Sequence, residues 1–285
     1  MPVHNASRSM LRSRIVTALA LLIVFLASLF WLPTSAFAAL MCLVVIGGSF
    51  EWGNLAGMPR WERAAFVIAC AGGYAVLAAF QLTGVFPQEA LTGVFVASVV
   101  FWIGCAPVWM WFGTRQRGKV LPFLLGLFVL LPCALASVVL HSRGPGVLLA
   151  ALALIWIADT AAYFSGRAFG RTKLAPSISP GKTLEGAAGA MLACIAYGVV
   201  LNALSPSVAH VTGNGMALTI MALSAALCVL SIVGDLFESM LKRQANIKDS
   251  GSILPGHGGI LDRIDSVTST LPAAALAAAF LMVAK

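Results

Sequence analysis

A series of long apolar segments, separated by short polar connections, constrains the fold of this chain more than any other feature. Hydrophobic residues make up 60% of the sequence and charged residues only 10%, against about 25% charged residues in an average soluble domain. A helix that crosses a bilayer needs roughly 20 apolar residues. By that measure the candidate spans are 15–32, 36–50, 64–82, 90–112, 120–140, 146–166, 184–204, 214–240 and 267–284.

These segments carry no alternating strand pattern, and only helices or closed barrels satisfy the backbone hydrogen bonds in lipid. The sequence therefore predicts an all-α polytopic membrane protein with about nine transmembrane helices. The segment 36–50 is short, and without it the count is about eight. The residues Ala36-Phe37-Ala38 resemble a signal-peptidase site, but the many spans that follow favour a retained anchor.

The basic residues indicate how the helices are oriented. If the N-terminus with Arg8, Arg12 and Arg14 is cytoplasmic, every Lys and Arg except Arg143 and Lys285 falls on the cytoplasmic side, as the positive-inside rule requires. The net charge of +8 then follows from topology and from attraction to anionic lipid headgroups, and it requires no nucleic acid as partner. We expect an integral protein of a bacterial-type cytoplasmic (inner) membrane.

The acidic residues divide the chain into two regions. Only Glu51, Glu62 and Glu89 precede residue 159, and all other acids lie within 159–265. Because acids contribute little to topology, this clustering points to chemistry.

We accordingly expect two regions within one membrane domain. Residues 1–145 are predicted to be scaffold helices, and residues 146–285 a catalytic region with cytoplasmic loops 167–183 and 241–266. The active site is then expected at the cytoplasmic ends of helices six to nine.

An aspartate lies inside the sixth apolar segment. Asp159, Tyr163 and Arg167 are spaced four residues apart, so they share one face of a helix that leads to the cytoplasmic end. An ionisable residue at membrane depth is costly and suggests function. The alternative is an Asp159–Arg167 pair that only fixes helix packing.

The segment 177–186, "SISPGKTLEG", contains Gly181-Lys182-Thr183, but it lacks the first glycine of a nucleotide-binding P-loop. We expect a turn that bears Ser179 and Lys182 and opens a helix near Thr183, with Glu185 in the first turn. The N–H groups at a helix N-terminus can bind phosphate. A plain helix cap explains the same residues equally well.

The eighth apolar segment ends in a polar face. Asp235, Ser239 and Lys242 lie on one side of the predicted helix, followed by Arg243. A carboxylate, a hydroxyl and an ammonium in line suit a metal–phosphate site. A belt of basic side chains at the membrane interface would explain Lys242 and Arg243, but not the deeper Asp235.

The stretch that follows concentrates the scarce charge of the chain. Asp262 and Asp265 are one helical turn apart, so both carboxylates can face one Mg²⁺ ion, which prefers oxygen ligands and substrate phosphates. Glycines at 256, 258 and 259 would let backbone N–H groups approach phosphate. His257 is a lone histidine, which disfavours zinc; it serves either as an acid–base group or in a structural hydrogen bond of the turn.

Several carboxylates and several cations without a nucleophile–base triad favour phosphoryl or nucleotidyl transfer. The residues Ser239-x-x-Lys242-Arg243, then Lys248-Asp249, then Gly256-His257-Gly258-Gly259-x-x-Asp262-Arg263-x-Asp265 resemble the signature of the phosphatidate cytidylyltransferases, also called CDP-diacylglycerol synthases. The segment 159–186 is similar to a second characteristic block of that family.

The resemblance implies a reaction and a set of roles. CTP and phosphatidic acid would give CDP-diacylglycerol and pyrophosphate with Mg²⁺, and a second metal ion is an open alternative. Asp235 and Asp262 would be the principal metal ligands, Asp265 would support them, and Lys242 would complete the catalytic set. Phosphates would be held by the following residues: Ser239, Arg243, Lys248, His257, Gly258, Gly259, Arg263, Ser179, Lys182 and Thr183. Supporting roles would fall to Asp159, Arg167, Glu185 and Asp249. The family also implies a homodimer.

Two alternatives are weighed against this interpretation. CDP-alcohol phosphotransferases carry Asp-Gly-x-x-Ala-Arg, which is absent from this sequence. A transporter would place acids at mid-membrane depth in several helices, often in paired repeats. Most acids here lie in or near the predicted cytoplasmic loops, and no repeat is visible.

Overall fold

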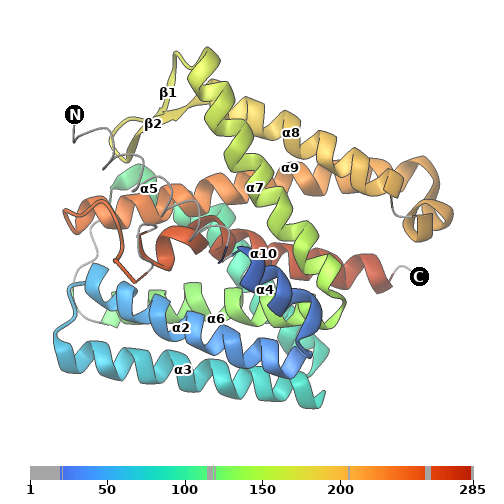
Figure 1. Cartoon of the computed structure of the whole chain (residues 1–285). Helices are drawn as coiled ribbons and strands as arrows, with labels where there is room; N and C mark the ends of the chain where they lie inside the picture. Colours follow the sequence, from blue (N-terminus) through green and yellow to red (C-terminus); the bar gives the residue numbers. More distant parts are fainter. Residues whose placement is uncertain are drawn as a thin grey trace, which may run out of the picture.

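The computed structural model describes residues 20, 22–113, 118, 120–204, 206–253 and 258–283. They form a helical bundle with one small β-hairpin (Figure 1). The elements after the short apolar helix Leu22–Trp31 are α2 (Thr34–Leu55), α3 (Arg60–Thr83), α4 (Gln88–Val100), the π-helical turn η1 (Phe101–Cys105), α5 (Ala106–Phe112), α6 (Val120–Ser142), α7 (Pro145–Phe169), β1 (Lys173–Ala175), β2 (Ser179–Thr183), α8 (Leu184–Leu204), α9 (Pro206–Gln244) and α10 (Leu261–Val283).

The predicted helical class is confirmed, and a helix lies at each of the expected apolar segments. Among the described residues, 7 helices are long and apolar enough to cross a membrane. The helix in the first expected segment, Leu22–Trp31, falls in the shorter class, and α10 in the ninth segment is not among the 7. The lengths and composition identify an integral membrane protein, and the count of nine spans stays a prediction.

The helix from Gln88 to Phe112 is continuous but changes pitch in the middle. The π-helical turn Phe101–Cys105 directly precedes Pro107, which lies in the first turn of α5. Proline lacks an N–H and clashes with the preceding turn of an α-helix, so a locally widened turn relieves the conflict. The apolar segment can thus span as one unit despite the proline.

The expected cytoplasmic loops are shorter than the sequence suggested. Helix α7 continues to Phe169, α9 continues to Gln244, and α10 begins at Leu261. Between α7 and α8 the chain forms the antiparallel β1–β2 hairpin, in which Lys173 pairs with Thr183 and Ala175 with Ser179. Pro176 and Pro180 disfavour a helix in this segment, and the two short strands pair with each other instead.

Three connections lie at the same end of the bundle: the α2–α3 turn, the hairpin, and the segment between α9 and α10 (Figure 1). These are three of the connections that the basic residues assign to one side of the membrane. Helix α9 lies between α8 and α10, while α10 also packs against α6 and α7. The polar residues at the ends of α7, α9 and α10 are therefore brought to one region.

Small side chains allow α9 and α10 to pack closely. A Cβ atom on Gly234 of α9 would lie 2.7 Å from the carbonyl oxygen of Asp265 on α10. On the same interface, the Ser269 hydroxyl donates a 2.7 Å hydrogen bond to the Leu230 carbonyl oxygen. Small residues and interhelical hydrogen bonds are the usual means of helix association in lipid. This packing holds Asp235, the next residue after Gly234, in place.

We predict that Gly234→Ala destabilises the protein by about 1–3 kcal/mol, because the added methyl group overpacks the α9–α10 interface. Gly93→Ala is the matched control, since a Cβ at Gly93 in α4 meets nothing within 4 Å. Thermal unfolding in detergent should show a lower midpoint for Gly234→Ala and an unchanged or higher one for Gly93→Ala. Equal midpoints would contradict the close packing.

Candidate active site

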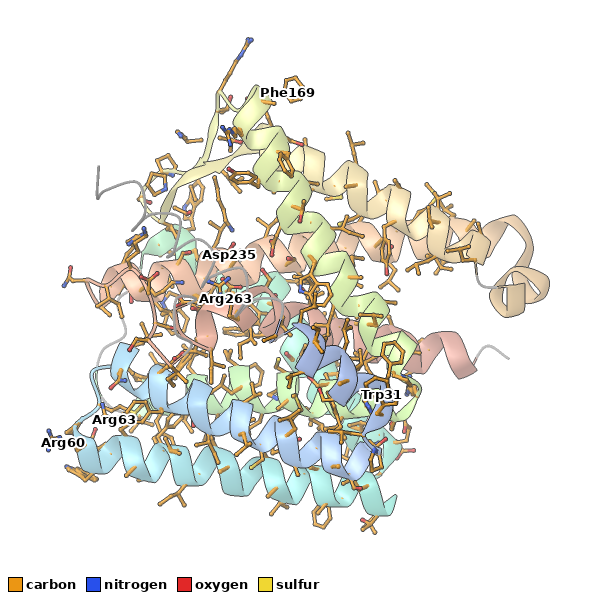
Figure 2. All side chains as sticks on the ribbon, in the orientation of Figure 1. Trp31, Arg60, Arg63, Phe169, Asp235 and Arg263 are labelled. Carbon is orange, nitrogen blue, oxygen red and sulfur yellow. The ribbon has the colours of Figure 1, made fainter. Side chains whose placement is uncertain are left out.

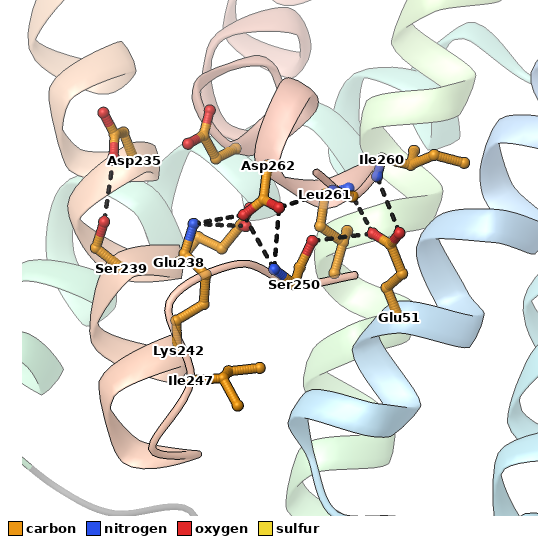
Figure 3. A network of polar contacts seen from close by, with 12 residues as sticks. Glu51, Asp235, Glu238, Ser239, Lys242, Ile247, Ser250, Ile260, Leu261 and Asp262 are labelled. Carbon is orange, nitrogen blue, oxygen red and sulfur yellow. Dashed lines mark hydrogen bonds and ion pairs between the residues drawn. The ribbon is translucent and has the colours of Figure 1, made fainter. Parts of the chain in front are cut away.

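Lys242 lies at the centre of a buried charge cluster between α9 and α10 (Figure 3). Its ammonium Nζ is 2.8 Å from Asp262 Oδ1 and 3.3 Å from Glu238 Oε1. All three side chains are largely shielded from solvent, so their interaction is only weakly screened. Removing Lys242 would leave two buried carboxylates without a counter-charge, which costs several kcal/mol.

Asp262 also fixes the segment that connects α9 to α10. Its carboxylate accepts hydrogen bonds from the backbone N–H of Ser250 at 3.0 and 3.1 Å and from that of Gly259 at 2.8 Å. Asp262 is the second residue of α10, so its side chain reaches back to the N–H of Gly259 and fastens the chain that enters the helix. Both carboxylate oxygens of Asp262 are thus engaged in the structure.

Glu51, at the end of α2, fastens the other side of the same segment. It is 1% exposed. Its carboxylate accepts hydrogen bonds from the backbone N–H of Ile260 at 3.0 Å, from that of Leu261 at 2.9 Å and from the Ser250 hydroxyl at 3.0 Å (Figure 3). The carboxylate satisfies two of the unpaired N–H groups at the α10 N-terminus and complements the helix dipole there.

Close contacts with the carboxylates of Glu51 and Asp262 explain why glycine occupies several positions of this segment. A Cβ on Gly259 would lie 2.5 Å from Glu51 Oε2, and a Cβ on Gly251 would lie 2.7 Å from Glu51 Cδ. Gly258 has a φ of 83°, a conformation that other residues rarely adopt. The backbone N–H of Gly259 is directed at Asp262 rather than at a vacant anion site. Gly256 and His257 lie outside the described residues.

A cavity of about 400 Å³ opens beside this cluster, between α7, the hairpin, α8 and α9. Asp159, Arg167, Lys182 and Asp235 are its charged lining residues. The expected face of α7 is confirmed, because Tyr163 also lines the cavity and accepts a 3.1 Å hydrogen bond from Arg167 Nη1. The segment that contains Asp159 and Lys182 and the segment that contains Asp235, about 50 residues further along the sequence, therefore meet in one cavity.

Asp235 and Lys182 form an ion pair within the cavity, with Lys182 Nζ 2.5 Å from Asp235 Oδ2. The Ser239 hydroxyl donates a 3.3 Å hydrogen bond to Asp235 Oδ1 (Figure 3), as the four-residue spacing predicts. Asp235 thus pairs with Lys182 of the hairpin, while Lys242, on the same helix, pairs with Asp262. Each lysine neutralises a different aspartate.

The hairpin is joined to α8 by a polar cap. The Thr183 hydroxyl accepts a 3.1 Å hydrogen bond from the backbone N–H of Gly186, which is the expected capping contact at the helix start. Glu185 accepts hydrogen bonds from the backbone N–H of Thr172 at 3.1 and 3.2 Å. Thr183 and Glu185 therefore hold the hairpin over the cavity, and Lys182 beside them reaches into it.

The remaining predicted residues lie around this region. Arg243 donates hydrogen bonds to the carbonyl oxygens of Ile178 and Ile247 at 3.4 and 3.3 Å. It thereby ties α9 to the hairpin. Lys248, Asp249 and Arg263 are exposed. Ser179 begins β2 and is half-buried.

The acids do not form a ready metal cluster. Among the described residues, no three His, Cys, Asp or Glu side chains are grouped closely enough to hold a metal ion. Asp265 lies on α10 and accepts a 2.7 Å hydrogen bond from the backbone N–H of Ser266. Asp159 and Asp265 are both close enough to Asp235 for their charges to interact.

Sequence reasoning missed two residues of this arrangement. Glu51 belongs to a helix predicted to be scaffold, more than 190 residues before the segment it fastens. Glu238, beside Lys242, was counted among the acids but given no role. For both residues, an acidic side chain within an apolar helix is the feature of the sequence that could have revealed them. No local pattern, however, pairs Glu51 with Ser250.

An apolar helical bundle with paired carboxylates and lysines beside a cavity at one end is the arrangement of a membrane-embedded enzyme that acts on charged groups. Comparison with known proteins specifies the family. A sequence model described as the cytidylyltransferase family matches residues 12–281. The chain belongs to this family.

Curated relatives agree with this assignment. The chain is 42% identical over 272 residues to a phosphatidate cytidylyltransferase of Pseudomonas aeruginosa, a match that covers 92% of this chain and 95% of the relative. It is 32% identical over 280 residues to one of Haemophilus influenzae, covering 92% and 96%. A Bacillus subtilis relative of the same name is 46% identical over 122 residues, which cover 43% of each chain.

We predict that Glu51→Gln destabilises the protein by about 1–3 kcal/mol, because the new amide group presents N–H donors where N–H donors already point. The segment 245–260 should also become more sensitive to limited proteolysis. Glu89→Gln is the matched control, since Glu89 is exposed in the first turn of α4. An unfolding midpoint and a proteolysis rate equal to the control would contradict the role of Glu51.

Proposed function

We propose that this chain transfers the cytidylyl group of CTP to phosphatidic acid, giving CDP-diacylglycerol and pyrophosphate. An oxygen of the lipid phosphate attacks the α-phosphorus of CTP, and the bond from that phosphorus to the β-phosphate oxygen breaks. The two full-length relatives named phosphatidate cytidylyltransferase support this assignment. The observation that carries it is the cavity in which Asp159, Lys182 and Asp235 meet at one end of an apolar bundle.

The cations of the site suit a substrate with several phosphates. Lys182 and Arg167 line the cavity, and Lys242 lies in the neighbouring cluster. In phosphoryl-transfer enzymes, positioning and neutralisation of charge supply most of the catalysis. Lys182 pairs with Asp235 before substrate arrives, and in the proposed reaction a phosphate of CTP competes for the same ammonium. Before substrate binds, Asp235 thus positions the Lys182 ammonium in the cavity, and the phosphate then replaces Asp235 as its partner.

The proposed setting is a bacterial inner membrane, with nine spans, a cytoplasmic N-terminus and the site facing the cytoplasm. Support comes from the location of three basic connections at one end of the bundle (Figure 1) and from the positive-inside rule. CTP is a soluble nucleotide, so this orientation gives it direct access. We also propose that residues 1–145 form a scaffold and residues 146–285 the catalytic region. Glu51 of the scaffold contributes hydrogen bonds to the catalytic region.

We also propose Mg²⁺ as the cofactor. Asp235 fits the ion, because it lines the cavity together with Asp159 and offers the hard carboxylate oxygens that Mg²⁺ prefers. Mg²⁺ needs only one or two carboxylates besides substrate phosphates and water. When bound, it would neutralise charge on the phosphates. Asp235 and Asp265 would hold it, whereas Asp262 would join them only on releasing Lys242. A second ion and a homodimer remain expectations from the family resemblance.

The test uses purified protein in detergent with phosphatidic acid, CTP labelled at its α-phosphate and Mg²⁺. We expect the label in a lipid-extractable product, and we expect EDTA to abolish the transfer. Asp235→Asn should reduce turnover at least about a hundredfold, because it removes a charge at the proposed metal and phosphate site. Folded wild-type protein that transfers no label would refute the proposed function, and transfer in EDTA would refute the metal.

Lys242→Ala should reduce turnover far more than Arg60→Ala does. Lys242 is buried between Asp262 and Glu238, whereas Arg60 is an exposed cation at the start of α3, near the same end of the bundle. A folding check by size-exclusion chromatography separates loss of structure from loss of chemistry. Similar activities for the two variants would mean that Lys242 contributes only general positive charge.

A further inference from the structure

A second cavity, of about 270 Å³, lies beside α10. It is enclosed by α2, α6, α7, α10 and the short helix Leu22–Trp31. Its lining is almost wholly apolar and includes Phe37, Val45, Leu130, Leu148 and Leu271. A packed protein interior contains few voids larger than a water molecule, so a cavity of this size within a helix bundle requires an explanation.

The cavity has one charged lining residue among those described, Arg263. Arg263 lies in the first turn of α10, and Val267 and Leu271 follow it at four-residue intervals along the same face. At 1.5 Å per residue, the cavity extends about 12 Å along α10 from the arginine. It is therefore a long apolar space with a guanidinium at the end where the candidate active site lies.

The apolar cavity adjoins the polar one along α7. Leu148, Leu152 and Trp156 line the apolar cavity at four-residue intervals, and Asp159, one turn further, lines the polar cavity. On α10, Arg263 lines the apolar cavity, whereas Asp265, two residues further along, interacts electrostatically with Asp235 of α9. Figure 2 labels Arg263 and Asp235 on these neighbouring helices. A group held at Arg263 would thus lie at the same end of α10 as Asp262 and Asp265.

We propose that this apolar cavity binds an acyl chain of the phosphatidic acid substrate, with the lipid phosphate beside Arg263. This inference rests on the proposed function, since it assigns the lipid a place in the same site. The negative phosphate complements the guanidinium, which binds phosphate oxygens in a two-pronged geometry. The apolar walls match a hydrocarbon chain. A helix of a second copy is excluded by size, because a helix with its side chains is about 10 Å wide.

The lipid-facing side of the cavity lies between the short helix and α7. There Trp156 is 42% exposed, and its ring contacts that of Phe25 edge to face with the centroids 6.1 Å apart. Trp156 and Phe25 therefore lie where the apolar cavity meets the exposed surface of the bundle. A chain that enters between these two rings reaches the cavity without crossing the polar surface.

The first test fills the cavity. Ala134→Phe places a ring in it from α6, and Ala79→Phe, on the exposed face of α3, is the matched control. Each methylene kept out of an apolar site weakens binding about fourfold. For Ala134→Phe we therefore expect a KM for dioleoyl phosphatidic acid at least about tenfold higher, with kcat and the KM for CTP unchanged. The KM for dihexanoyl phosphatidic acid should stay the same. Equal effects on long and short chains would overturn the proposal.

The second test needs no variant. Phosphatidic acid that carries a photoreactive diazirine in one acyl chain is crosslinked to the wild-type protein without CTP, and the labelled peptides are mapped. Label in the segments 37–45, 130–137, 148–156 or 264–271 is the expected result. Label confined to other segments would overturn the proposal, even where the enzyme transfers label normally. A wild-type enzyme that crosslinks in the cavity but makes no CDP-lipid would instead refute the proposed function and keep the lipid site.

Arg263→Gln distinguishes a lipid phosphate from free phosphate or nucleotide phosphate. We expect a KM for phosphatidic acid about tenfold or more higher for both chain lengths, with the KM for CTP unchanged, because a charge-assisted hydrogen bond to phosphate is lost. Arg263→Lys should restore part of the affinity. A change in the KM for CTP alone would overturn the assignment of Arg263 to the lipid.

Discussion

The Glu51 carboxylate joins two parts of the chain that the sequence keeps far apart. It accepts two backbone N–H groups at the start of α10 and the Ser250 hydroxyl, while Asp262 accepts the N–H groups of Ser250 and Gly259 from the opposite side. The segment between α9 and α10 is thus held between two carboxylates. Because that segment sets where α10 begins, the positions of Asp262, Arg263 and Asp265 depend on Glu51.

The second constraint is charge balance in an apolar surrounding. An unpaired charge in such a place costs several kcal/mol, and the structure avoids this by pairing Lys182 with Asp235 and Lys242 with Asp262 and Glu238. Such pairs hold the site together without substrate. In the proposed reaction, an incoming phosphate would offer each lysine a new partner and would leave a carboxylate available for a cation. The resting ion pairs and the proposed catalytic arrangement therefore use the same residues.

The sequence predicts well whatever depends on composition and on spacing within one helix. The apolar segments became helices, Asp235 and Ser239 form the expected contact, and Tyr163 and Arg167 share a face with Asp159. It predicts less well what depends on contacts between distant segments. The β1–β2 hairpin, the pairing of Lys182 with Asp235 and the role of Glu51 arise from tertiary packing, for which no periodic pattern exists. The sequence predicts earlier ends for α7 and α9 because Arg167 in α7 and Lys242 and Arg243 in α9 interrupt the apolar run.

The signature residues at the start of α10 lie on two different faces of the helix. Asp262 and Asp265 lie toward α9, where Lys242 and Asp235 are located, whereas Arg263, Val267 and Leu271 lie toward the apolar cavity. Neighbouring positions on a helix point about 100° apart, so one short run of residues can serve two surroundings. A nucleotide and a lipid differ most in polarity, and α10 contacts the charge cluster of α9 on one face and lines the apolar cavity on another. In the proposed reaction, the Asp262-Arg263-x-Asp265 spacing would allow one helix to contact the phosphates of both substrates.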